Sequence, residues 1–511
     1  MSAVPDRFNL ARYCLRDSPA PALLVVHGLD GVAAVERGED THVERWSFAD
    51  LEAAVAGIAH GLLASGLRRG DRVMIRLGNT TDYALAHFGA MAAGLVSLPS
   101  SDQLTDGEAA FLLSDSGARA LIHEPGRGDL GEVLRFTPAD LATWRVGERA
   151  QFADTAAEDP AFLVYTSGTT SRPKGVLHAH RSAWGRRPMY DGWYGLGADD
   201  IVLHAGAFNW TYTLGVGLTD PWAVGACAVV YTGERDRHVW ARLLRASGAT
   251  MFAAVPGVYR QILDADPEGL AGLRDTGFRH SLVAGEALPQ RTREAWEEVT
   301  GTPLFEALGM SEISTFISSS PSVPVRPGTV GRAQPGRRIG VLDADGEEVD
   351  LGQVGRLAVD ATDPGLMLGY WNRPEESPVR DGWFVTSDLV SLDDDGYVTY
   401  HGRVDDVITA GGYRISPDEV EAVLARAPGV AEVAVTSMQV KQDVAVVAAF
   451  VVAAPGVGED EVRGAIDAAA RDLAAYKRPR EVVVLVALPR TRNGKLLRRS
   501  LRSGQRGPSR R

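Results

Sequence analysis

One stretch of the chain combines hydroxyl, glycine and lysine residues in a pattern suited to phosphate binding. It spans Tyr165–Gly175, reads Tyr-Thr-Ser-Gly-Thr-Thr-Ser-Arg-Pro-Lys-Gly, and begins at the end of an apolar run, Phe162–Tyr165, that predicts a strand. Glycine lets backbone N–H groups turn toward an anion, hydroxyls donate further hydrogen bonds, and Lys174 adds a positive charge. The stretch is not a P-loop, because Pro173 and Gly175 flank the lysine where that motif has Gly and Ser/Thr. Taken alone, the same cluster is also typical of an ordinary turn.

Later segments supply the other groups that a nucleotide reaction needs. Residues 285–287 (Gly-Glu-Ala) follow a predicted strand, as a turn that contacts adenine would. Residues 308–312 (Leu-Gly-Met-Ser-Glu) offer a hydroxyl, Ser311, for a phosphate and a carboxylate, Glu312, for Mg²⁺, an ion that prefers oxygen ligands. Asp388 follows an aromatic strand, where its carboxylate can accept hydrogen bonds from ribose hydroxyls.

Two cations and a pair of aspartates complete this set. Arg403 can reach the same sugar or a phosphate, and a turn that begins at Pro489 carries Lys495. Each of these groups has an ordinary structural interpretation as well. Lys495 could be a solvated lysine, Glu312 a carboxylate at a helix N-terminus, and Asp405 with Asp406 a simple Asx turn. No single segment therefore indicates a nucleotide reaction, but the agreement of several segments does.

The elements expected around these groups alternate between strand and helix. Ser47 is a predicted N-cap with Asp50 three residues on, and apolar residues then recur at helical spacing to Leu62. The remaining predicted elements are strands at 73–77, 95–98, 120–123, 201–204, 227–231 and 281–284 and a helix at 83–93. This βαβ rhythm predicts an α/β fold with mostly parallel sheets covered by helices.

The pattern of predicted elements changes twice toward the C-terminus. From about residue 324 to 404, short strands punctuated by Gly, Pro and Asp predict a small β-rich subdomain within an N-terminal domain of residues 1–404. After Asp405 the pattern resets to helix 418–426, strands 430–436 and 444–452, helix 459–474 and strand 482–486. We therefore expect a small C-terminal α+β domain over residues 405–511.

Composition limits the class of protein. The 511 residues are 45% hydrophobic and 23% charged, which is typical of a folded, water-soluble protein. The net charge of −13 argues against a nucleic-acid partner. The two cysteines exclude a disulfide framework and a Cys-based zinc site, and neither a signal peptide nor a spanning segment is expected, so we expect a cytoplasmic protein. The arginine-rich tail after Lys495 is interpreted as a solvated end.

In order and spacing, these segments resemble the adenylate-forming superfamily of acyl-CoA synthetases, peptide-synthetase adenylation domains and luciferases. The resemblance covers about residues 8–499. Residues 405–408 (Asp-Asp-Val-Ile) running into 411–417 (Gly-Gly-Tyr-Arg-Ile-Ser-Pro) look most like the medium-chain acyl-CoA and benzoate-CoA ligases. The resemblance to this superfamily implies that the following residues contact the nucleotide or coenzyme A: Thr166, Ser167, Gly168, Thr169, Thr170, Lys174, Gly285, Glu286, Ala287, Leu308, Gly309, Met310, Asp388, Arg403, Gly411 and Gly412.

The resemblance implies a reaction in two steps. A carboxylate attacks the α-phosphorus of ATP to give acyl-AMP and pyrophosphate, and the thiol of coenzyme A then attacks the acyl carbonyl. Lys495, Ser311 and Glu312 would act in the first step, with Glu312 holding Mg²⁺. The C-terminal domain is implied to be mobile and to turn about Asp405 between the steps, which would bring Gly411 and Gly412 to the pantetheine tunnel.

Three residues depart from the family pattern. Ser171 stands where the phosphate loop usually has glycine, and a left-handed backbone there would cost about 1–2 kcal/mol. Leu308 replaces a tyrosine that often stacks on adenine. Ser387 stands before Asp388 in place of a glycine. The first two of these residues put the affinity for ATP in question.

The implied acid pocket is mostly apolar. Its expected walls are Trp210, Tyr212, Leu214, Gly285, Leu308 and Met310. Trp210 is either a core residue or the aromatic gate beside the carboxylate. Because these walls contain no lysine or arginine for a second carboxylate, a monocarboxylic aryl or medium-chain acid is expected.

Two other functions stay open at this point. An adenylation enzyme could load a carrier protein instead of free coenzyme A, and a lapsed enzyme could bind nucleotide without catalysis. The expected partners are a small carboxylic acid, ATP, Mg²⁺ and coenzyme A, with no nucleic acid and no membrane span. No segment encodes an oligomeric state, and a homodimer is one option.

Overall fold

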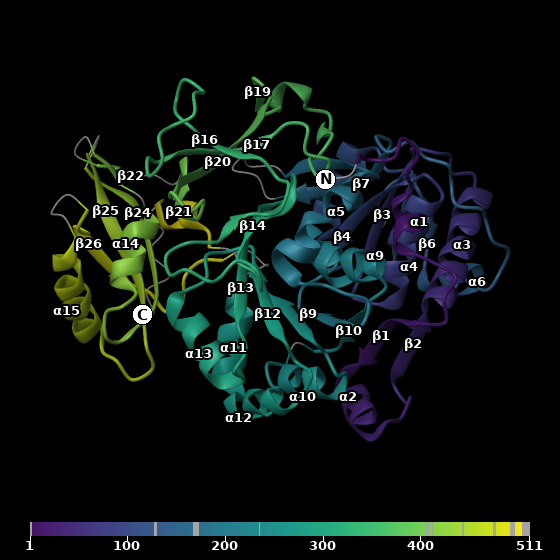
Figure 1. Ribbon diagram of the computed structural model, residues 1–511, viewed down its shortest axis with the longest axis horizontal. Coiled ribbons are helices and arrows are strands. Elements are labelled where there is room, and N and C mark those ends of the chain that lie inside the picture. Colours follow the sequence, from purple (N-terminus) through teal and green to yellow (C-terminus); the bar gives the residue numbers. More distant parts are fainter. Residues whose placement is uncertain are drawn as a thin grey trace. The chain divides into compact units, whose positions relative to one another are not determined.

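The computed structural model describes residues 3–126, 130–166, 173–234, 236–404, 408–410, 413–415, 417–441, 444–473, 477–490 and 496–502. The chain divides into two compact units, residues 1–338 with 360–382 and residues 339–359 with 383–511. Both are α/β in composition (Figure 1). The expected hinge, Asp405, lies outside the described residues, so the domain boundary and the hinge stay predictions.

The capping signal at Ser47 produces the predicted helix. Helix α3 spans Phe48–Ala64, and the Ser47 side chain accepts from the Asp50 backbone N–H while the Asp50 side chain accepts from the backbone N–H of Ser47. This capping box satisfies two backbone donors that have no partner within the helix. The helix ends before Gly66, whose φ of 91° is left-handed.

The first unit contains a nine-stranded sheet. Its order is β15 (Arg332–Ala333), β14 (Ser314–Ser318), β13 (Leu304–Met310), β12 (His280–Ala284), β11 (Met251–Ala254), β9 (Ile201–His204), β10 (Cys227–Thr232), β1 (Pro21–His27) and β2 (Val43–Ser47). The six strands from β13 to β1 are parallel, as predicted, and the strands beyond them are antiparallel.

A seven-stranded sheet forms the second large layer of this unit. Its order is β18 (Gly369–Tyr370), β8 (Lys174–Ala179), β7 (Pro160–Thr166), β4 (Val96–Ser101), β3 (Arg72–Leu77), β5 (Ala120–His123) and β6 (Leu134–Phe136). Strands β7, β4, β3, β5 and β6 are parallel, whereas β8 runs antiparallel to both β7 and β18. Sequence alternation did not predict this antiparallel edge.

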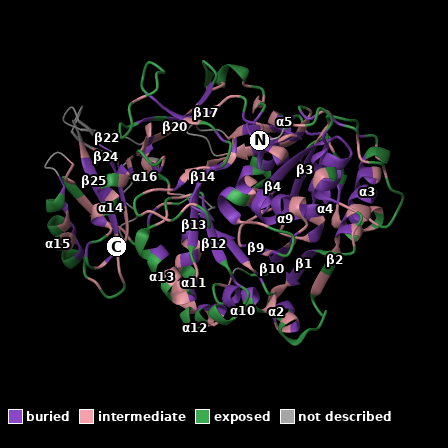
Figure 2. Cartoon of the chain, viewed as in Figure 1, coloured by how far each residue is buried: buried purple, intermediate pink, exposed green. Residues whose placement is uncertain are grey.

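The side chains of the strands divide the core into layers. Leu23 and Val25 of β1 belong to one buried cluster, together with α3, α4 (Thr81–Ala92) and residues of β3, whereas Leu24 and Val26 belong to another. Successive strand residues point to opposite faces, so α3 and α4 lie between the two sheets. These inner positions are buried throughout (Figure 2).

Other helices cover the outer faces. The nine-stranded sheet is covered by α2 (Gly28–Arg37), α10 (Val239–Ala246), α11 (Pro256–Ala265), α12 (Pro267–Ala271) and α13 (Gln290–Thr300). Helix α5 (Asp106–Ser116) packs on the outer face of the seven-stranded sheet. Short helical segments complete the unit at α1 (Leu10–Cys14), α6 (Pro138–Trp144), α7 (Ser182–Gly185), Tyr190–Tyr194, α8 (Thr211–Leu214), Gly215–Thr219 and α9 (Asp220–Val224).

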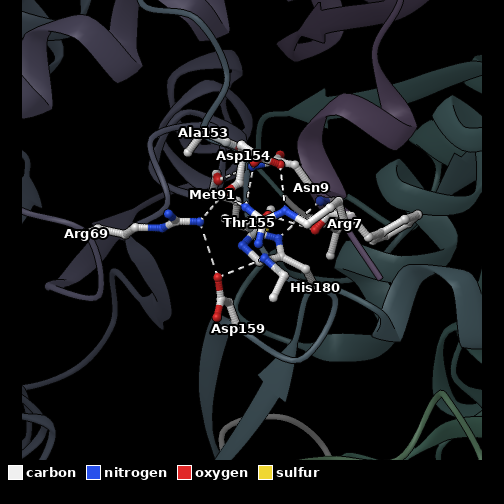
Figure 3. Close-up of polar contacts among 12 residues, drawn as sticks. Arg7, Asn9, Arg69, Met91, Ala153, Asp154, Thr155, Asp159 and His180 are labelled. Atoms are coloured by element: carbon white, nitrogen blue, oxygen red, sulfur yellow. Dashed lines mark hydrogen bonds and ion pairs between the residues drawn. The ribbon is translucent and has the colours of Figure 1, made fainter. Parts of the chain in front are cut away.

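The N-terminal segment is fastened to the chain that leads into β7. The Asn9 amide donates to the carbonyl oxygens of Met91 and Ala153, each at 3.1 Å, and the Thr155 hydroxyl donates to the carbonyl of Phe8 at 2.7 Å (Figure 3). The Leu10 backbone N–H donates to Nδ1 of the buried His180 at 3.1 Å. These buried hydrogen bonds fix the start of the strand that ends at the predicted phosphate loop.

The second unit contains an antiparallel sheet and a compact α/β end. Four strands of one sheet lie in this unit, and they are β16 (Ile339–Leu342), β17 (Gly355–Asp360), β20 (Trp383–Leu392) and β21 (Val398–Arg403). The C-terminal end has the hairpin of β22 (Ile408–Ala410) and β23 (Tyr413–Ile415), then α14 (Pro417–Leu424), β24 (Val430–Lys441), β25 (Val444–Ala453), α15 (Glu459–Ala469), β26 (Glu481–Val484) and α16 (Arg498–Arg502). Helices α14 and α15 share one buried cluster with β24 and β25. Among the described residues, no helix is both long and apolar enough to span a membrane.

Candidate active site

Several predicted site residues of the first unit lie at the carboxyl edge of the nine-stranded sheet, whereas Thr166 and Lys174 belong to the seven-stranded sheet. Residues 285–287 follow the carboxyl end of β12, and Leu308 lies near the carboxyl end of β13, which pairs in parallel with β12 through Ala284 and Ala307. The segment that contains Trp210 follows β9 of the same sheet. The carboxyl edge of parallel strands is where α/β proteins place ligand sites.

The predicted phosphate loop is the connection of a β hairpin. Strands β7 and β8 pair in register, with Thr166 opposite Lys174, so both ends of the loop meet. Thr166 and Lys174 are each half-buried. The residues between them that were expected to bind phosphate, Ser167, Gly168, Thr169 and Thr170, lie outside the described residues, as does Ser171.

Tyr370 connects the predicted phosphate lysine with the predicted magnesium ligand. The Lys174 ammonium lies over the Tyr370 ring, 5.3 Å from its centroid, and the Tyr370 hydroxyl donates to Oε1 of Glu312 at 2.8 Å. Strand β18 positions the tyrosine, because Tyr370 pairs with Val176 of β8, two residues from Lys174. Lys174 also forms an ion pair with Glu376. Two charged groups 138 positions apart in the sequence thus contact one aromatic side chain.

The turn that carries Ser311 and Glu312 is held from two sides. It joins β13 to β14, and the Glu312 carbonyl accepts from the Met367 backbone N–H at 2.8 Å. His178 of β8 lies with Nε2 2.8 Å from the Ser311 carbonyl oxygen. Because His178 and Met367 come from β8 and from the residues just before β18, the seven-stranded sheet and its edge position the turn of the other sheet.

Glycine is required just before this turn. A β-bulge interrupts the pairing of β13 and β14 at Gly309, and a Cβ at this position would overlap the backbone of Ser314. A side chain there would push the two strands apart and displace Glu312. The sequence alternative in which Glu312 begins a helix is wrong, because no helix starts there and the residue lies in a strand connection.

Glu312 fits a magnesium ion that is held mainly by nucleotide oxygens. Its carboxylate is half-buried, and one oxygen is oriented by Tyr370. Within the described ranges, no group of three or more acidic, histidine or cysteine side chains could form a metal cage. Magnesium is usually held by one or two carboxylates together with substrate phosphates and water, so this carboxylate suits it.

The residues expected to form the walls of the acid pocket differ in burial and in their contacts. Trp210 is half-buried and caps α8 rather than joining a core cluster, and Leu214 is buried against a small cavity. The Tyr212 hydroxyl lies 3.4 and 3.3 Å from the carbonyl oxygens of Ala254 and Leu282, and its ring contacts His204. Gly285 is exposed and Met310 half-buried. Whether these residues contact an acid stays a prediction.

Asn79 fixes the loop that leads to Trp210. Its amide donates to the Gly206 carbonyl at 2.7 Å and accepts from the Phe208 backbone N–H at 2.9 Å. This two-point clamp replaces backbone pairing in a loop that belongs to neither sheet. Asn79 lies just after β3 of the seven-stranded sheet, so it is a second tether between the two sheets at this edge.

The second unit brings together two other predicted residues. Asp388 of β20 and Arg403 of β21 lie opposite each other, with Arg403 Nε 3.9 Å from Oδ1 of Asp388. The Tyr400 hydroxyl donates to the same carboxylate at 3.2 Å. Nε of Arg403 is buried and has no hydrogen-bond partner among the described residues. A donor of this kind suits a ribose hydroxyl or a phosphate.

Four other predicted functional residues fall outside the described residues. They are Asp405, Gly411, Gly412 and Lys495, and their roles stay predictions. Glu286 is half-buried and Ala287 exposed in the turn after β12.

Several residues that build the site carry no local sequence signal. Tyr370, His178 and Asn79 each contact a segment more than fifty positions away. Their spacing follows no helix or strand motif with chemistry, and only the pairing of β8 with β18 brings Tyr370 to Lys174. A single sequence contains no record of such long-range pairing.

We predict that Tyr370→Phe lowers about 10-fold the efficiency of the adenylation reaction that the motifs imply. The substitution keeps the aromatic face under Lys174 but removes a hydrogen bond to a charged carboxylate, which is worth about 1.5–3 kcal/mol. The magnesium concentration that gives half-maximal pyrophosphate release should rise. Tyr259→Phe is the matched control, since it removes a buried hydroxyl bonded to the Leu282 carbonyl, far from Glu312 in the sequence. An unchanged magnesium requirement in Tyr370→Phe would contradict the positioning role.

Buried histidines make the stability of the protein sensitive to acid. Burial lowers the pKa of His87 and His204 to about 3 and that of His178, His180 and His280 to about 4. The unfolded chain takes up protons on these residues below about pH 6.5, whereas the folded chain does not until about pH 4. The free energy of unfolding is therefore highest above pH 6.5 and decreases as the pH falls toward 4.

We predict that the urea midpoint at pH 5.5 is well below that at pH 7.5, with each buried histidine contributing roughly 1 kcal/mol. His87→Leu should make the midpoint depend less steeply on pH. The control is His238→Gln, which changes an exposed histidine and should leave this dependence as it is. Equal midpoints at the two pH values would contradict the prediction.

The comparison with known proteins agrees with this geometry. Residues 26–371 match the family described as AMP-binding enzyme, and residues 419–495 match the AMP-binding enzyme C-terminal domain. The chain therefore belongs to the AMP-binding enzyme family, which is the adenylate-forming superfamily that the motifs resemble.

Relatives of known activity are similar over most of their length. The chain is 29% identical to 3-hydroxybenzoate–CoA ligase of Aromatoleum sp. (strain CIB), with 90% of this chain and 92% of that protein covered. It is 31% identical to benzoate–CoA ligase of Thauera aromatica, with 86% of each covered. The solved anthranilate CoA ligase AuaEII in complex with anthranoyl-AMP superposes with a TM-score of 0.86 at 26% identity, covering 98% of both chains.

Proposed function

We propose that this protein is an ATP-dependent carboxylate–CoA ligase that activates a monocarboxylic acid as acyl-AMP and transfers it to coenzyme A. The observation that carries the proposal is the contact chain from Lys174 through Tyr370 to Glu312, which combines a cation for phosphate with a carboxylate for magnesium. Family membership and the ligase activities of the relatives support the same function.

The described residues would contribute positioning and charge to the first step. Adenylation transfers the AMP group from ATP to the acid, and it depends on alignment and charge neutralisation more than on covalent help from the protein. Lys174 would hold the departing pyrophosphate. A magnesium ion at Glu312 would neutralise phosphate charge, and Lys495 would bridge the acid carboxylate and the α-phosphate.

The nucleotide sugar is assigned to the second unit. Asp388 would accept hydrogen bonds from the ribose hydroxyls, and Nε of Arg403 would donate to the same sugar or to the phosphate. Rotation about Asp405 would then bring Gly411 and Gly412 toward coenzyme A. We place the reaction in the cytoplasm, where the two unpaired cysteines, Cys14 and Cys227, would remain reduced.

The acid is assigned by class only. The relatives support an aryl acid, and an apolar pocket that includes Leu214 would also accept a medium-chain acid. Discrimination between such acids rests on small differences, since one methylene is worth about 1–3 kcal/mol. The test is acid-dependent pyrophosphate release over benzoates and short-, medium- and long-chain acids. We expect release with aryl or medium-chain acids, and the absence of release with every acid would overturn the proposal.

A further inference from the structure

A buried arginine lies behind the turn that carries Ser311 and Glu312, and the adenylation chemistry does not use it. Nε and Nη2 of Arg186 donate to the two carboxylate oxygens of Asp220, each at 2.6 Å, and the Tyr194 hydroxyl donates to the same carboxylate at 2.7 Å. Asp220 is fully buried and Arg186 is 8% exposed. This two-point pair has no net charge, so it does not provide a site for a second anion.

Arg186 borders a cavity of about 30 Å³, which we call the Arg186 cavity. Its wall includes His178, Arg186, Leu214, Gly215, Ser311 and Ser314. A water molecule needs about 10–15 Å³ of such space, so the cavity has room for a small polar group but not for an aromatic ring. Since Ser311 belongs to the wall, the cavity lies next to the candidate active site.

The polar groups of the wall are only partly satisfied. Arg186 donates a third hydrogen bond, from Nη1 to the Ser314 hydroxyl, so three of the five N–H donors of a guanidinium have partners among the described residues. Nε2 of His178 lies 2.8 Å from the Ser311 carbonyl oxygen, so the hydrogen is assigned to Nε2. Nδ1 is then an acceptor, and it is buried without a partner in the described part of the chain.

The backbone around the cavity is adapted to this arrangement. A Cβ at residue 215 would overlap the Arg186 guanidinium, so glycine is required there for the arginine to lie flat against α8 and the residues after it. Ser314 has a φ of 73°, a left-handed conformation that few non-glycine residues adopt. Such conformations persist where neighbouring contacts fix them, and they cluster at ligand sites.

We propose that the Arg186 cavity receives a hydroxyl group carried by the acyl portion of the acid, so that Arg186, His178 and Ser314 select hydroxylated acids. The proposal rests on the proposed ligase function. A hydroxyl can accept from a free guanidinium N–H and donate to Nδ1 of His178, whereas a methyl group or a halogen can do neither. A carboxylate is disfavoured because Asp220 already neutralises Arg186.

The test compares acids that differ in one group of nearly equal size. The ratio of kcat/KM for pyrophosphate release is measured for each hydroxybenzoate isomer against the matching methylbenzoate, with benzoate as reference. We expect the best hydroxybenzoate to exceed its methyl analogue at least 10-fold, because a site built to hydrogen-bond a hydroxyl rejects the analogue that lacks it. A ratio near one for all three isomers would overturn the proposal.

Substitutions in the wall of the Arg186 cavity test whether the preference for hydroxylated acids arises there. Ser314→Ala removes the acceptor of Arg186 and should reduce the ratio several-fold while benzoate is still activated. Ser318→Ala is the matched control on β14, since it removes a buried hydroxyl bonded to the Gly192 carbonyl without changing the cavity wall, and the ratio should not change. If Ser314→Ala does not fold, His178→Phe serves instead, because it keeps a ring stacked on Phe162 but removes the Nδ1 acceptor. It also removes the Nε2 hydrogen bond to the Ser311 carbonyl, so turnover of benzoate should fall too, and only the ratio between hydroxylated and methylated acids is compared.

The outcomes separate this proposal from the ligase function. Two results would overturn only the role of the cavity. One is acid-dependent release by the wild type with the same kcat/KM for hydroxybenzoates and methylbenzoates. The other is a kcat/KM ratio that is the same in the wild type and in Ser314→Ala. Such a result would identify the cavity as a site for structural water. Absence of release with every acid would overturn the ligase function itself and this proposal with it.

Discussion

Replacing Glu312 by glutamine is expected to reduce acid-dependent pyrophosphate release about 10²–10³-fold. The amide has nearly the same shape, and its carbonyl oxygen can still accept from the Tyr370 hydroxyl. The substitution removes only the negative charge that would hold magnesium beside the phosphates. Loss of one group that stabilises developing charge typically costs a factor of this size.

The Glu312→Gln experiment needs a control that shows whether replacing a glutamate by glutamine elsewhere lowers the activity or the stability. Glu297→Gln is suitable, because this carboxylate accepts from the Leu304 backbone N–H on the far end of β13 and an amide oxygen can replace it. Both variants should unfold at nearly the wild-type urea concentration. Raising the magnesium concentration should restore part of the activity of Glu312→Gln. Wild-type release in Glu312→Gln at low magnesium would exclude Glu312 as the metal ligand.

The second large effect is expected at Lys495, and it should separate the two half-reactions. Lys495→Ala should lower the rate of adenylation about 10²–10³-fold, because the lysine is proposed to stabilise the charge that develops between the acid and the α-phosphate. Thioester formation from supplied acyl-AMP should be nearly unchanged, because pyrophosphate has already left. Pyrophosphate release and acyl-CoA formation from acyl-AMP are measured separately.

A lysine from the same segment of the chain provides the control. Lys477 forms an ion pair with Glu419 and is assigned no role in either half-reaction. Lys477→Ala should leave both rates close to those of the wild type. Equal loss of both half-reactions in Lys495→Ala would contradict the assignment, since it would indicate a general effect on the C-terminal end.

Elements of this chain that are specified by neighbouring residues could be predicted from the sequence. The capping box at Ser47 and the valine-rich run at Val444 involve neighbouring residues only, and α3 and β25 form there. The phosphate-binding role of residues 166–174 is predicted from residue types that are contiguous, and it stays a prediction. The antiparallel pairing of β7 with β8 could not be predicted, since it depends on a partner strand rather than on alternation.

The candidate site shows the same limit. The position of Ser311 and Glu312 after a strand could be predicted from a short motif, and their roles stay predictions. Their surroundings could not be predicted. Arg186 and Asp220 are 34 positions apart, and neither belongs to a motif. The acid-pocket walls without a cation stay a prediction, and the sequence does not indicate that a neutralised arginine borders the cavity beside Ser311. Only packing of α9 and the segment after α7 brings these charges together.

In the proposed reaction, one chain joins a carboxylic acid to free coenzyme A through an acyl-AMP intermediate. The most direct measurement quantifies AMP and acyl-CoA in one reaction with ATP, magnesium, a responsive acid and free coenzyme A. We expect equal amounts of AMP and acyl-CoA, with neither product when the acid is omitted. Turnover that requires a carrier protein, or ATP binding without acid-dependent AMP formation, would contradict the proposed reaction.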